Sequence, residues 1–357
     1  MEPISVSAFV ERALYDPATG FYERGGRAGR RGDFVTSPEV GPLFGAVLAG
    51  ALDRWWEEAG RPDPFVVHEH GAGPGSLARG VVQARPSCGP ALRWVLVERS
   101  EAQRALHADH LPHVGAPGAV AAWPAPGGGP LVASAGSRPG GPVHVVVANE
   151  LLDNLPFDLA ERHGAGWDEV RLVEGPGDTW TEVLVPLDGA RSARLDGLAP
   201  AADPGSRAPL QEAAGEWVAA GLGQLAPGGR LVVLDYGTTT AALAARPWTQ
   251  WVRTFRGHQR GGAPWGDPGL QDVTVEVAWD QVGGASRPPD RLRPQAEALR
   301  AWGIDALVEE GRRLWRERAG PADLAALRAR SRVGEAEALV DPDGLGGFTV
   351  AEWGGGP

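Results

Sequence analysis

Apolar positions recur along the chain in two spacings, which predict an alternation of strands and helices. Short continuous apolar runs predict buried strands at 65–69, 92–97, 143–148 and 230–234. Apolar residues at helical spacing predict helices at 37–59, 76–85, 101–111 and 209–225. Strands that alternate with helices build a mostly parallel sheet with helices on both faces. We therefore expect a doubly wound α/β fold.

The ends of these elements and the stretches between them carry their own signals. Thr36, Pro38 and Glu39 form a helix-start signature, with a hydroxyl cap, a proline in the first turn and an acid near the positive helix end. The other stretches predict a Pro/Gly-rich loop with a short strand around Val120 at 112–142, hairpins at 160–206, a glycine-rich loop at 257–271, a strand at 272–279, two helices at 295–332, and a closing strand at 347–353.

Composition adds limits on the class of protein. With 357 residues, 43% of them hydrophobic and 22% charged, the chain has the make-up of an ordinary globular protein. The net charge of −11 argues against nonspecific binding of nucleic acid. Cys88 is the one cysteine, so an intramolecular disulfide is excluded. The N-terminal stretch lacks a basic region, and no apolar run approaches the roughly 20 residues that span a bilayer. We expect no membrane contact and a cytoplasmic location.

A glycine-rich turn follows the first apolar run. Glu69 is followed by Gly71, Ala72, Gly73 and Gly75 in an E-x-G-x-G-x-G pattern, and glycines let the backbone approach a bulky ligand. This is the form found in enzymes that use S-adenosylmethionine (SAM), where the acid can face the cationic end of the cofactor. A nicotinamide-binding turn would have glycine at 76, where this chain has serine.

Glu98 ends the next predicted strand, about where a carboxylate accepts the ribose hydroxyls of a nucleoside cofactor. An acid stands there in nicotinamide enzymes too, so Glu98 alone does not choose between the two cofactors. His68 and His70 flank Glu69 and would both face the opposite side of the strand. No third ligand lies nearby in the sequence, so we expect no metal site.

A second polar cluster follows the strand at 143–148. Asn149, Glu150 and Asp153 lie within five residues of one another, and such groups are costly to bury unless they are wet, paired or used. If a helical turn begins at 150, Glu150 and Asp153 share a face and can hold an amine or guanidinium. The alternative is a helix start stabilised by acids. His258 is a candidate base or substrate contact, although a lone loop histidine is more often simply exposed.

Taken together, these segments resemble the MidA family of SAM-dependent methyltransferases, over about residues 5–353. The motifs that carry the resemblance are Ala13-Leu14-Tyr15-Asp16-Pro17 with Gly20-Phe21-Tyr22, Gly32-Asp33-Phe34-Val35-Thr36-Ser37-Pro38-Glu39, Leu43-Phe44-Gly45, Glu69-His70-Gly71-Ala72-Gly73-Pro74-Gly75, Val97-Glu98-Arg99-Ser100, Ala148-Asn149-Glu150-Leu151-Leu152-Asp153-Asn154-Leu155-Pro156, Leu234-Asp235-Tyr236-Gly237, Asp267-Pro268-Gly269, Asp272-Val273-Thr274 and Gly346-Gly347-Phe348.

The resemblance implies a Rossmann-like class I methyltransferase fold, with a mostly parallel sheet and an antiparallel last strand. It implies an N-terminal helical and loop segment at 1–62 that covers the active site. The methyltransferase domain would span 63–357, with inserted acceptor-side elements at about 160–206 and 245–332. Mitochondrial members of the family are complex I assembly factors that methylate an arginine of a core subunit, so the resemblance implies N-methylation of a protein arginine.

Departures from the family pattern leave the acceptor open. The family usually has Ala-His-Val where this chain has Val275-Glu276-Val277, and glutamine and glutamate where it has Pro42 and Ala46. The acceptor is therefore a protein or a small molecule, and a divergent enzyme with its own acceptor is one reading. A non-catalytic assembly protein that keeps a SAM pocket is another, and a nicotinamide oxidoreductase is a third. A homodimer also stays open.

These observations lead to one hypothesis for the site residues. Gly71, Ala72, Gly73 and Gly75 would pack against SAM, Glu69 would face its amino or sulfonium end, and Glu98 would hold its ribose. Asn149 would touch both cofactor and acceptor, and Glu150 and Asp153 would orient a nitrogen acceptor beside the methyl group. The segment from Asp33 to Glu39, including Thr36 and Pro38, would fold over the cofactor.

Overall fold

A computed structural model describes residues 2–26, 36–111, 131–164, 166–257, 259–318 and 323–354. Its contacts divide the chain into two compact units, each made of three stretches of sequence. Unit 1 comprises Met1–Phe34, Glu150–Gly223 and Asp235–Pro289, and unit 2 comprises Val35–Asn149, Gln224–Leu234 and Asp290–Pro357. The predicted division of the chain into an N-terminal segment at 1–62 and a methyltransferase domain at 63–357 stays a prediction.

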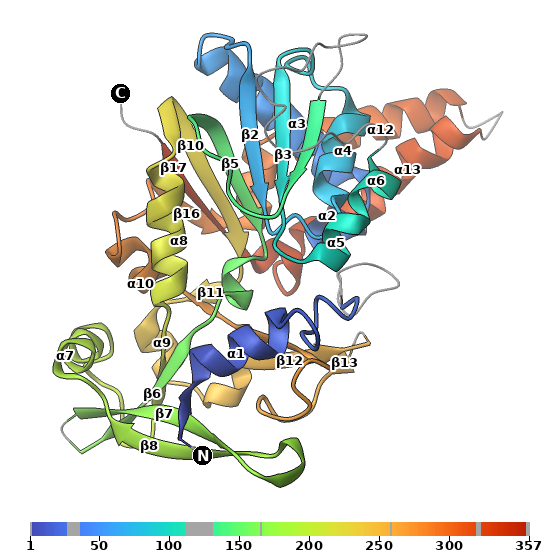
Figure 1. Ribbon diagram of the computed structural model, residues 1–357. Coiled ribbons are helices and arrows are strands. Elements are labelled where there is room, and N and C mark those ends of the chain that lie inside the picture. Colours follow the sequence, from blue (N-terminus) through green and yellow to red (C-terminus); the bar gives the residue numbers. More distant parts are fainter. Residues whose placement is uncertain are drawn as a thin grey trace. The chain divides into compact units, whose positions relative to one another are not determined.

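Unit 2 contains a seven-stranded sheet in the order β16-β17-β10-β5-β2-β3-β4 (Figure 1). The five strands from β10 to β4 pair in parallel, and β16 pairs antiparallel with β17. The chain runs outward from β2 to one edge and then returns to β5 on its other side, so the strand order reverses between β2 and β5. The bounds are β2 (Phe65–His70), β3 (Leu92–Val97), β4 (Leu131–Ala135), β5 (Val143–Asn149), β10 (Leu225–Asp235), β16 (Arg291–Pro294) and β17 (Thr349–Gly354).

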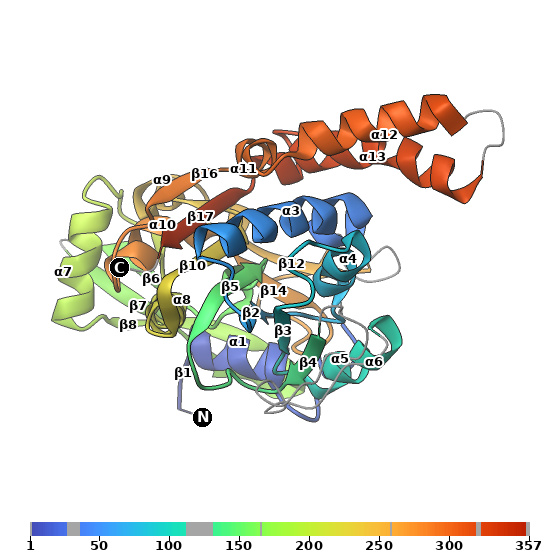
Figure 2. The same cartoon turned by 90° about the horizontal axis from the view of Figure 1, so that it is seen from above.

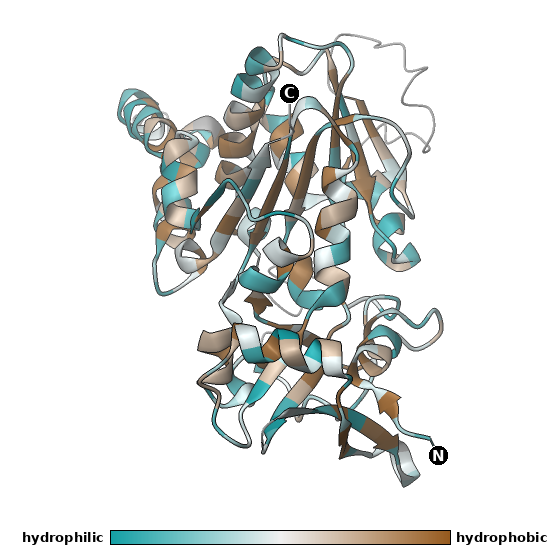
Figure 3. Ribbon diagram, turned by 90° about the vertical axis from the view of Figure 1, so that its left-hand side faces the viewer, coloured by the Kyte–Doolittle hydropathy of each residue, from teal (hydrophilic) through white to brown (hydrophobic). Residues whose placement is uncertain are grey.

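Helices of unit 2 bury their apolar sides on this sheet. Leu48 and Leu52 of α3 and Leu77 of α4 belong to one buried cluster with Val67 and Trp94 of the sheet. The strands are among the most hydrophobic parts of the ribbon (Figure 3), as expected of strands covered on both faces. The helices are α2 (Ser37–Val40), α3 (Pro42–Glu58), α4 (Ser76–Ala84), α5 (Glu101–Ala105), α6 (His107–His110), α11 (Gln295–Ala301), α12 (Ile304–Arg318) and α13 (Leu324–Val340). The last two lie side by side as a helical pair (Figure 2).

A glycine contact brings α3 and α4 together. A Cβ atom added at Gly45 would come within 2.5 Å of the carbonyl carbon of Gly80, and one added at Gly80 would come within 3.1 Å of the Gly45 Cα. The two helix backbones therefore touch where neither carries a side chain. This contact holds α4, and with it the turn that precedes α4, against the N-terminal half of α3.

Unit 1 is built from antiparallel strands and short helices. Its largest sheet contains β1 (Ile4–Ser5), β6 (Asp158–His163), β7 (Gly166–Glu174), β8 (Trp180–Pro186) and β9 (Arg207–Leu210). Smaller sheets pair β12 (Val252–Arg256) with β13 (Gln259–Arg260) and β14 (Asp272–Val275), and β11 (Gly237–Thr238) with β15 (Val277–Ala278). The helices are α1 (Val6–Tyr15), α7 (Gly189–Leu198), α8 (Glu212–Leu222), α9 (Thr240–Ala244) and α10 (Trp279–Gly284). Phe9 of α1 packs in one buried cluster with Leu172, Trp251 and Val273.

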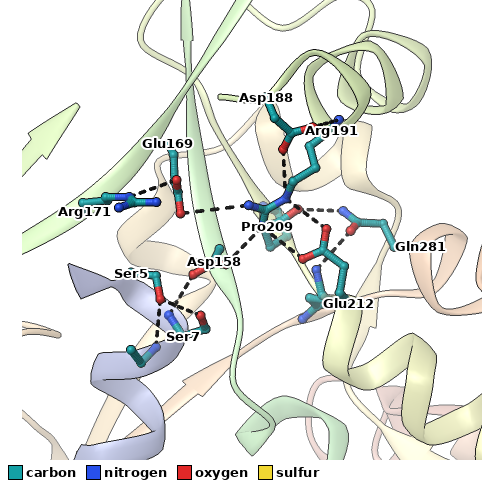
Figure 4. A network of polar contacts seen from close by, with 12 residues as sticks. Ser5, Ser7, Asp158, Glu169, Arg171, Asp188, Arg191, Pro209, Glu212 and Gln281 are labelled. Carbon is teal, nitrogen blue, oxygen red and sulfur yellow. Dashed lines mark hydrogen bonds and ion pairs between the residues drawn. The ribbon is translucent and has the colours of Figure 1, made fainter. Parts of the chain in front are cut away.

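A charged network ties α7 and α8 to the large sheet of unit 1 (Figure 4). The Arg191 guanidinium lies 3.0 Å from both the Asp158 and the Glu212 carboxylates, and 4.0 Å from that of Glu169. The second Asp158 oxygen accepts a hydrogen bond from the Ser7 backbone N–H at 2.9 Å. Burial lowers the pKa of Arg191, but the contacts with Asp158 and Glu212 outweigh that effect and raise the pKa above its usual value. The network connects five elements, α1, β6, β7, α7 and α8, around the Arg191 guanidinium.

Four predicted strands are confirmed, at 65–70, 92–97, 143–149 and 225–235, and so is the helix at 76–84. The predicted helix at 37–59 is broken at Gly41, and Thr36 makes no side-chain cap there. The predicted helix at 101–111 is likewise two short helices, α5 and α6.

Other predictions need correction. The helix predicted at 209–225 spans only Glu212–Leu222, and its predicted first residues belong to β9. Pro227, Gly228 and Gly229 lie within β10, where the register with β5 shifts. The stretch predicted as a loop at 112–142 contains β4, whereas Val120 lies outside the described residues. The hairpin region contains helix α7, the strand at 272–279 is interrupted at Glu276, and the C-terminal helices number three instead of two in the described chain. Nor does any described helix combine the length and apolar character needed to cross a bilayer.

Candidate functional site

The glycine-rich turn joins the end of β2 to the start of α4. Gly71, Gly73 and Gly75 have φ angles of 64°, 51° and 86°, in the left-handed region that side chains with a Cβ rarely adopt. Open space lies beside Gly73, where an added Cβ would meet nothing within 4 Å. The backbone N–H of Gly71 donates to the Val97 carbonyl at 2.9 Å, which holds the turn at the end of β3. Glycine at 71, 73 and 75 thus suits the left-handed backbone of the turn, and glycine at 73 also leaves room for a ligand.

Glu98 binds this turn directly. Its Oε2 accepts a hydrogen bond from the Gly73 N–H at 2.9 Å and its Oε1 accepts one from the Ser100 N–H at 2.8 Å. Burial raises the pKa of Glu98, and these two backbone donors oppose that effect. Because each carboxylate oxygen has a second lone pair, the side chain can still accept hydrogen bonds from a ligand. The sequence predicted that Glu98 ends a strand and holds a ribose; the structure adds that its carboxylate contacts the glycine turn.

Glu69 lies on the same face of β2 as Val67, which packs against helices α3 and α4. Its Oε2 accepts a hydrogen bond from the Trp94 indole N–H at 2.8 Å, and the carboxyl is buried. That burial raises the pKa of Glu69 to about 8. Near neutral pH the carboxyl is therefore mostly protonated. Its predicted role beside a cationic cofactor stays a prediction.

Two further side chains support the turn. The Glu39 carboxylate of α2 accepts a hydrogen bond from the Ser76 hydroxyl at the start of α4. Buried His107 of α6 lies 2.8 Å from the Gly73 carbonyl through Nε2 and 2.8 Å from the Ser134 hydroxyl through Nδ1. A carbonyl only accepts, so Nε2 carries the proton and Nδ1 accepts from Ser134. Burial also lowers the pKa of His107, which favours this neutral form.

The N-terminal stretch predicted to cover the cofactor is described from Thr36 onward. Thr36 is buried and Pro38 lies in the first turn of α2, so these residues and Glu39 belong to the same unit as the glycine turn. Asp33 to Val35 lie outside the described residues. Their predicted part in covering a cofactor stays a prediction.

His68 and His70 lie on the face of β2 opposite Glu69, as predicted, with ring centroids 6.1 Å apart. Burial lowers the pKa of His68 to about 4 and also lowers that of His70, so both rings are neutral near pH 7. Within the described ranges, no group of three or more His, Cys, Asp or Glu side chains is arranged to hold a metal ion.

The polar cluster after β5 adopts a different turn from the one predicted. Asn149 ends β5, and Glu150 has a φ of 53°, an uncommon backbone conformation for a residue with a side chain. The helical turn begins only at Leu152 and spans Leu152–Asn154. The premise that Glu150 and Asp153 share one helical face is therefore wrong, because Glu150 precedes the helical turn. Asn149 belongs to unit 2, whereas Glu150 and Asp153 belong to unit 1.

Asp153 meets the end of β10 within unit 1. Its Oδ2 lies 2.9 Å from the Tyr236 hydroxyl, which lies 2.7 Å from the Thr274 hydroxyl. Asp235 accepts hydrogen bonds from the backbone N–H groups of Leu152, Asp153 and Tyr236. Burial raises the pKa of Asp153 to about 7 and raises that of Asp235 well above its usual value, with the nearby charges adding to the effect on Asp235. Asp153 therefore takes up a proton near neutral pH.

Asn154, next to Asp153, anchors the same turn. Its amide donates to the Asp272 carboxylate at 3.0 Å, and its side-chain oxygen accepts from the Tyr22 hydroxyl at 3.0 Å. The Tyr15 hydroxyl donates to its backbone carbonyl at 3.2 Å. Five of the sequence motifs named above thus meet around 153–154: those containing Tyr15, Tyr22, Asp153 and Asn154, Asp235 and Tyr236, and Asp272 and Thr274. No local pattern predicted these contacts, which join residues far apart in the chain.

The remaining candidate lies elsewhere. His258 falls outside the described residues. A cavity of about 660 Å³ in unit 1 is lined by Arg12, Trp180, Trp265 and the loop at 266–270, among others. None of its described lining residues is a predicted site residue. The predicted residues therefore gather in two places, the glycine turn of unit 2 and the Asp153 turn of unit 1.

The strand order of the sheet, the E-x-G-x-G-x-G turn and the acid that binds it define an α/β protein of the SAM methyltransferase class. Residues 47–292 match the model of a family described as "Putative S-adenosyl-L-methionine-dependent methyltransferase", and the chain belongs to this family. The resemblance to the MidA family is thereby confirmed, and SAM is the cofactor of the class.

Curated relatives match over shorter stretches. The human mitochondrial protein arginine methyltransferase NDUFAF7 is 26% identical over 219 residues, which cover 53% of this chain and 48% of that protein. Its Drosophila melanogaster homologue is 40% identical over 81 residues, which cover 23% of this chain and 18% of that protein. The chain thus spans half or less of the length of these relatives.

Solved structures match over nearly the whole chain. A Burkholderia thailandensis protein described as a "likely methyl transferase", solved bound to S-adenosyl-homocysteine, has a TM-score of 0.79 and 27% identity. The match covers 98% of this chain and 87% of that one. A native structure of an uncharacterized protein from the same organism gives a TM-score of 0.77 and 26% identity, over 99% and 87% of the two chains. The methyltransferase α/β fold is shared along the length of the chain.

Proposed function

We propose that this chain transfers a methyl group from SAM to a nitrogen of a protein acceptor, an arginine guanidinium. The family and the names of the curated relatives support this acceptor. We also assign the sheet of unit 2 to the Rossmann-like class I arrangement, in which ligands bind beyond the carboxyl ends of the strands where the order reverses. The observation that carries the proposal is the buried acid pair, Asp153 and Asp235, just after β5 and at the end of β10.

The residues of unit 2 fit a SAM site. The open space beside Gly73 gives a ligand room at the turn, and the Glu98 carboxylate is fixed there with lone pairs to spare. We propose that Glu98 accepts the ribose hydroxyls and that the glycines allow close approach of the backbone. Thr36, Pro38 and Glu39 would cover the cofactor, because the Glu39 carboxylate accepts a hydrogen bond from Ser76 at the start of α4. SAM supplies an activated methyl group on a sulfonium sulfur.

The residues of unit 1 supply acceptor chemistry. A carboxylate can orient a guanidinium through its N–H donors, and Asp153 has an oxygen, Oδ1, with no hydrogen-bond partner among the described residues. Methylation leaves an extra proton on the acceptor nitrogen, which Asp153 can take at Oδ1. A base works best with a pKa near the working pH, and burial brings the pKa of Asp153 to about 7. Asn149 and Glu150 flank this group in the chain.

Methyl transfer from radiolabelled SAM tests the function. The protein is incubated with the protein fraction of a lysate and, separately, with its low-mass fraction. We expect label in protein, recovered as methylarginine after hydrolysis. Label only in the low-mass fraction would indicate a small-molecule methyltransferase. Binding of SAM without label in either fraction would indicate a non-catalytic protein.

Binding measurements test the cofactor residues. Glu98→Ala removes the carboxylate that would hold the ribose, so we expect SAM binding by calorimetry to weaken about tenfold or more, equivalent to ~1.4 kcal/mol. Ala at exposed Glu101, three residues along, should leave binding unchanged. Asp153→Asn should bind SAM normally and lose turnover. Normal binding of SAM by the Glu98→Ala protein would remove that assignment.

A further inference from the structure

Tyr236 contacts Asp153 through a side-chain hydrogen bond, although Tyr236 itself has no role in the function proposed above. We propose that Tyr236 is the positioning residue for Asp153: its hydroxyl fixes Oδ2 of the carboxyl, so that Oδ1 is presented to the acceptor nitrogen. This inference rests on the proposed methyl transfer and adds the group that sets the geometry of the base.

The hydrogen-bond direction follows from the chemistry of the groups. The Tyr236 hydroxyl oxygen lies 2.9 Å from Asp153 Oδ2 and 2.7 Å from the Thr274 hydroxyl oxygen. An ionised carboxylate only accepts, so Tyr236 donates its single proton to Asp153 and accepts from Thr274. The Thr274 hydroxyl therefore directs the Tyr236 proton toward the carboxylate.

The Tyr236 ring is itself held on several sides. Its backbone N–H donates to Asp235 and its carbonyl accepts from the Val277 N–H, both at 2.9 Å. The Arg253 guanidinium lies over the ring, 5.5 Å from its centroid, and Glu276 binds that guanidinium. A ring fixed by its backbone, its hydroxyl and its face has little freedom to move. The oxygen that it binds is fixed with it.

Asp235 fixes the turn on which Asp153 stands. One of its oxygens, Oδ2, accepts from the backbone N–H groups of Leu152 and Asp153, at 2.9 and 3.2 Å. The backbone of Asp153 and one of its carboxyl oxygens are therefore both held by the adjacent residues Asp235 and Tyr236. Asp153 Oδ1 remains, buried and without a hydrogen-bond partner among the described residues. A buried oxygen left in this way is costly, and a donor from the acceptor would satisfy it.

Burial, hydrogen bonds and nearby charges all act on the pKa values of Asp153 and Asp235. Burial raises the pKa of Asp153, whereas the hydrogen bond from Tyr236 and, to a smaller extent, the charge of Arg253 lower it. Burial and the charges of Asp153 and Glu150 raise the pKa of Asp235. Removing the Tyr236 hydroxyl deletes a contact that favours the ionised carboxylate. The pKa of Asp153 should therefore rise further in Tyr236→Phe.

The test compares Tyr236→Phe with Thr254→Val in the whole 357-residue chain. Thr254 is buried on β12 and its hydroxyl donates to the Gly262 carbonyl at 2.8 Å, so its removal matches the loss of a buried hydroxyl that bonds to another group than Asp153. Methyl transfer to lysate protein is followed against pH, and SAM binding is followed by calorimetry. For Tyr236→Phe we expect kcat to fall about tenfold or more, with KM and SAM affinity within about twofold, and the acidic limb of the pH profile to move to higher pH. Thr254→Val should keep the wild-type profile.

A second readout does not depend on turnover. The carbonyl stretch of a protonated carboxyl, seen in infrared difference spectra against pH and absent in Asp153→Asn, reports the titration of Asp153. Its midpoint should rise in Tyr236→Phe and not in Thr254→Val. Wild-type kcat and an unshifted midpoint in Tyr236→Phe would overturn the inference while leaving the methyltransferase proposal intact. A wild-type protein that binds SAM and methylates nothing would contradict both.

Discussion

Asp153 combines burial, a single fixed oxygen and a neighbouring acid in one side chain. Its pKa of about 7 places the change between its neutral and ionised forms in the range where enzymes work. Because Asp153 and Asp235 lie close together, their titration belongs to the pair and not to either residue alone. We therefore expect the pH dependence of the proposed reaction to come from Asp153 and not from the substrate.

The pH profile of kcat follows from that arrangement. Only the ionised form of Asp153 can take a proton from the acceptor, so kcat should rise as the pH increases through about 7 and then level off. The measurement is methyl transfer under saturating SAM across this range. Asp153→Asn should lower kcat at every pH. A wild-type kcat that falls as the pH rises through this range would contradict the assignment of Asp153 as the base.

Glu69 makes a separate prediction about stability. Its pKa is about 8 in the folded protein against 4.5 for an ordinary glutamate, so unfolding releases a proton between these values. The folded state binds more protons than the unfolded state there, and the free energy of unfolding therefore falls as the pH rises toward 8. Glu69→Gln keeps the acceptor for Trp94 and removes the titration. It should be more stable than the wild type at pH values above about 8, by on the order of a few kcal/mol.

Urea unfolding at acidic and at alkaline pH measures this difference. Gln at exposed Glu216 controls for the exchange of a carboxyl for an amide. If Glu69→Gln shows the same loss of stability with rising pH as the wild type, the carboxyl of Glu69 is ionised in the folded protein. Its predicted place beside a cationic cofactor would then gain support.

At the residue scale, the sequence identified groups but not their contacts. Glu98 and the glycines could be predicted to act together because both belong to short motifs at strand ends. His107 had no such signal, although it binds the Gly73 carbonyl, since nothing in its local sequence points toward the turn. Tyr236 and Asp153 are 83 positions apart in the sequence, and only the folding of unit 1 brings them together.

At the scale of elements, the contact between α3 and α4 depends on a pair of glycines, Gly45 and Gly80. Gly45 lies against the backbone of Gly80, so Gly45→Ala forces the helices apart and should destabilise the protein by about 1–3 kcal/mol. Gly50 lies on the same helix, and an added Cβ there would meet only the Trp302 carbonyl, at 4.0 Å. Gly50→Ala should stabilise by roughly 0.5–1 kcal/mol, because alanine is the better helix former.

Denaturant unfolding of both alanine variants measures the pair. Opposite signs at Gly45 and Gly50 would assign the effect to packing, since helix propensity acts alike at both positions. Equal stabilisation at both would show that α3 and α4 do not touch at Gly45. SAM binding by the Gly45→Ala protein would then show how far the turn before α4 depends on this contact.

The elements that could be predicted are those with strong local patterns. The apolar runs of β2, β3 and β5 have few polar interruptions and predict buried strands to within a residue or two. β4 was missed because Leu-Val-Ala-Ser-Ala is short, weakly apolar and preceded by a Pro/Gly-rich stretch. Pro227 and the two glycines after it are usual helix terminators, but here they form the irregular start of β10. The helix at 37–59 is divided by Gly41, whose backbone is extended, with a φ of 166°.

At the scale of the whole molecule, ligand binding should stabilise the folded protein. S-adenosyl-homocysteine at about 100 times its Kd would add about 2.7 kcal/mol to the free energy of unfolding. We expect thermal unfolding to shift upward with this ligand and with SAM, and not with NAD. A shift with NAD alone would favour the nicotinamide reading of the glycine turn. Glu98→Ala should reduce the shift and Glu101→Ala should not.

The division of each unit among three stretches of sequence affects how the protein is made. Phe9 of α1 packs in the same cluster as Val273 of β14, which is synthesised more than 250 residues later. At about 5–20 residues per second, the ribosome needs roughly 15–50 s to add that partner strand. During that time the apolar side of the first helix has only part of its native cluster on the nascent chain, such as Leu172 of β7 once that strand has emerged. The cluster around the first helix is therefore completed only after β14 has emerged.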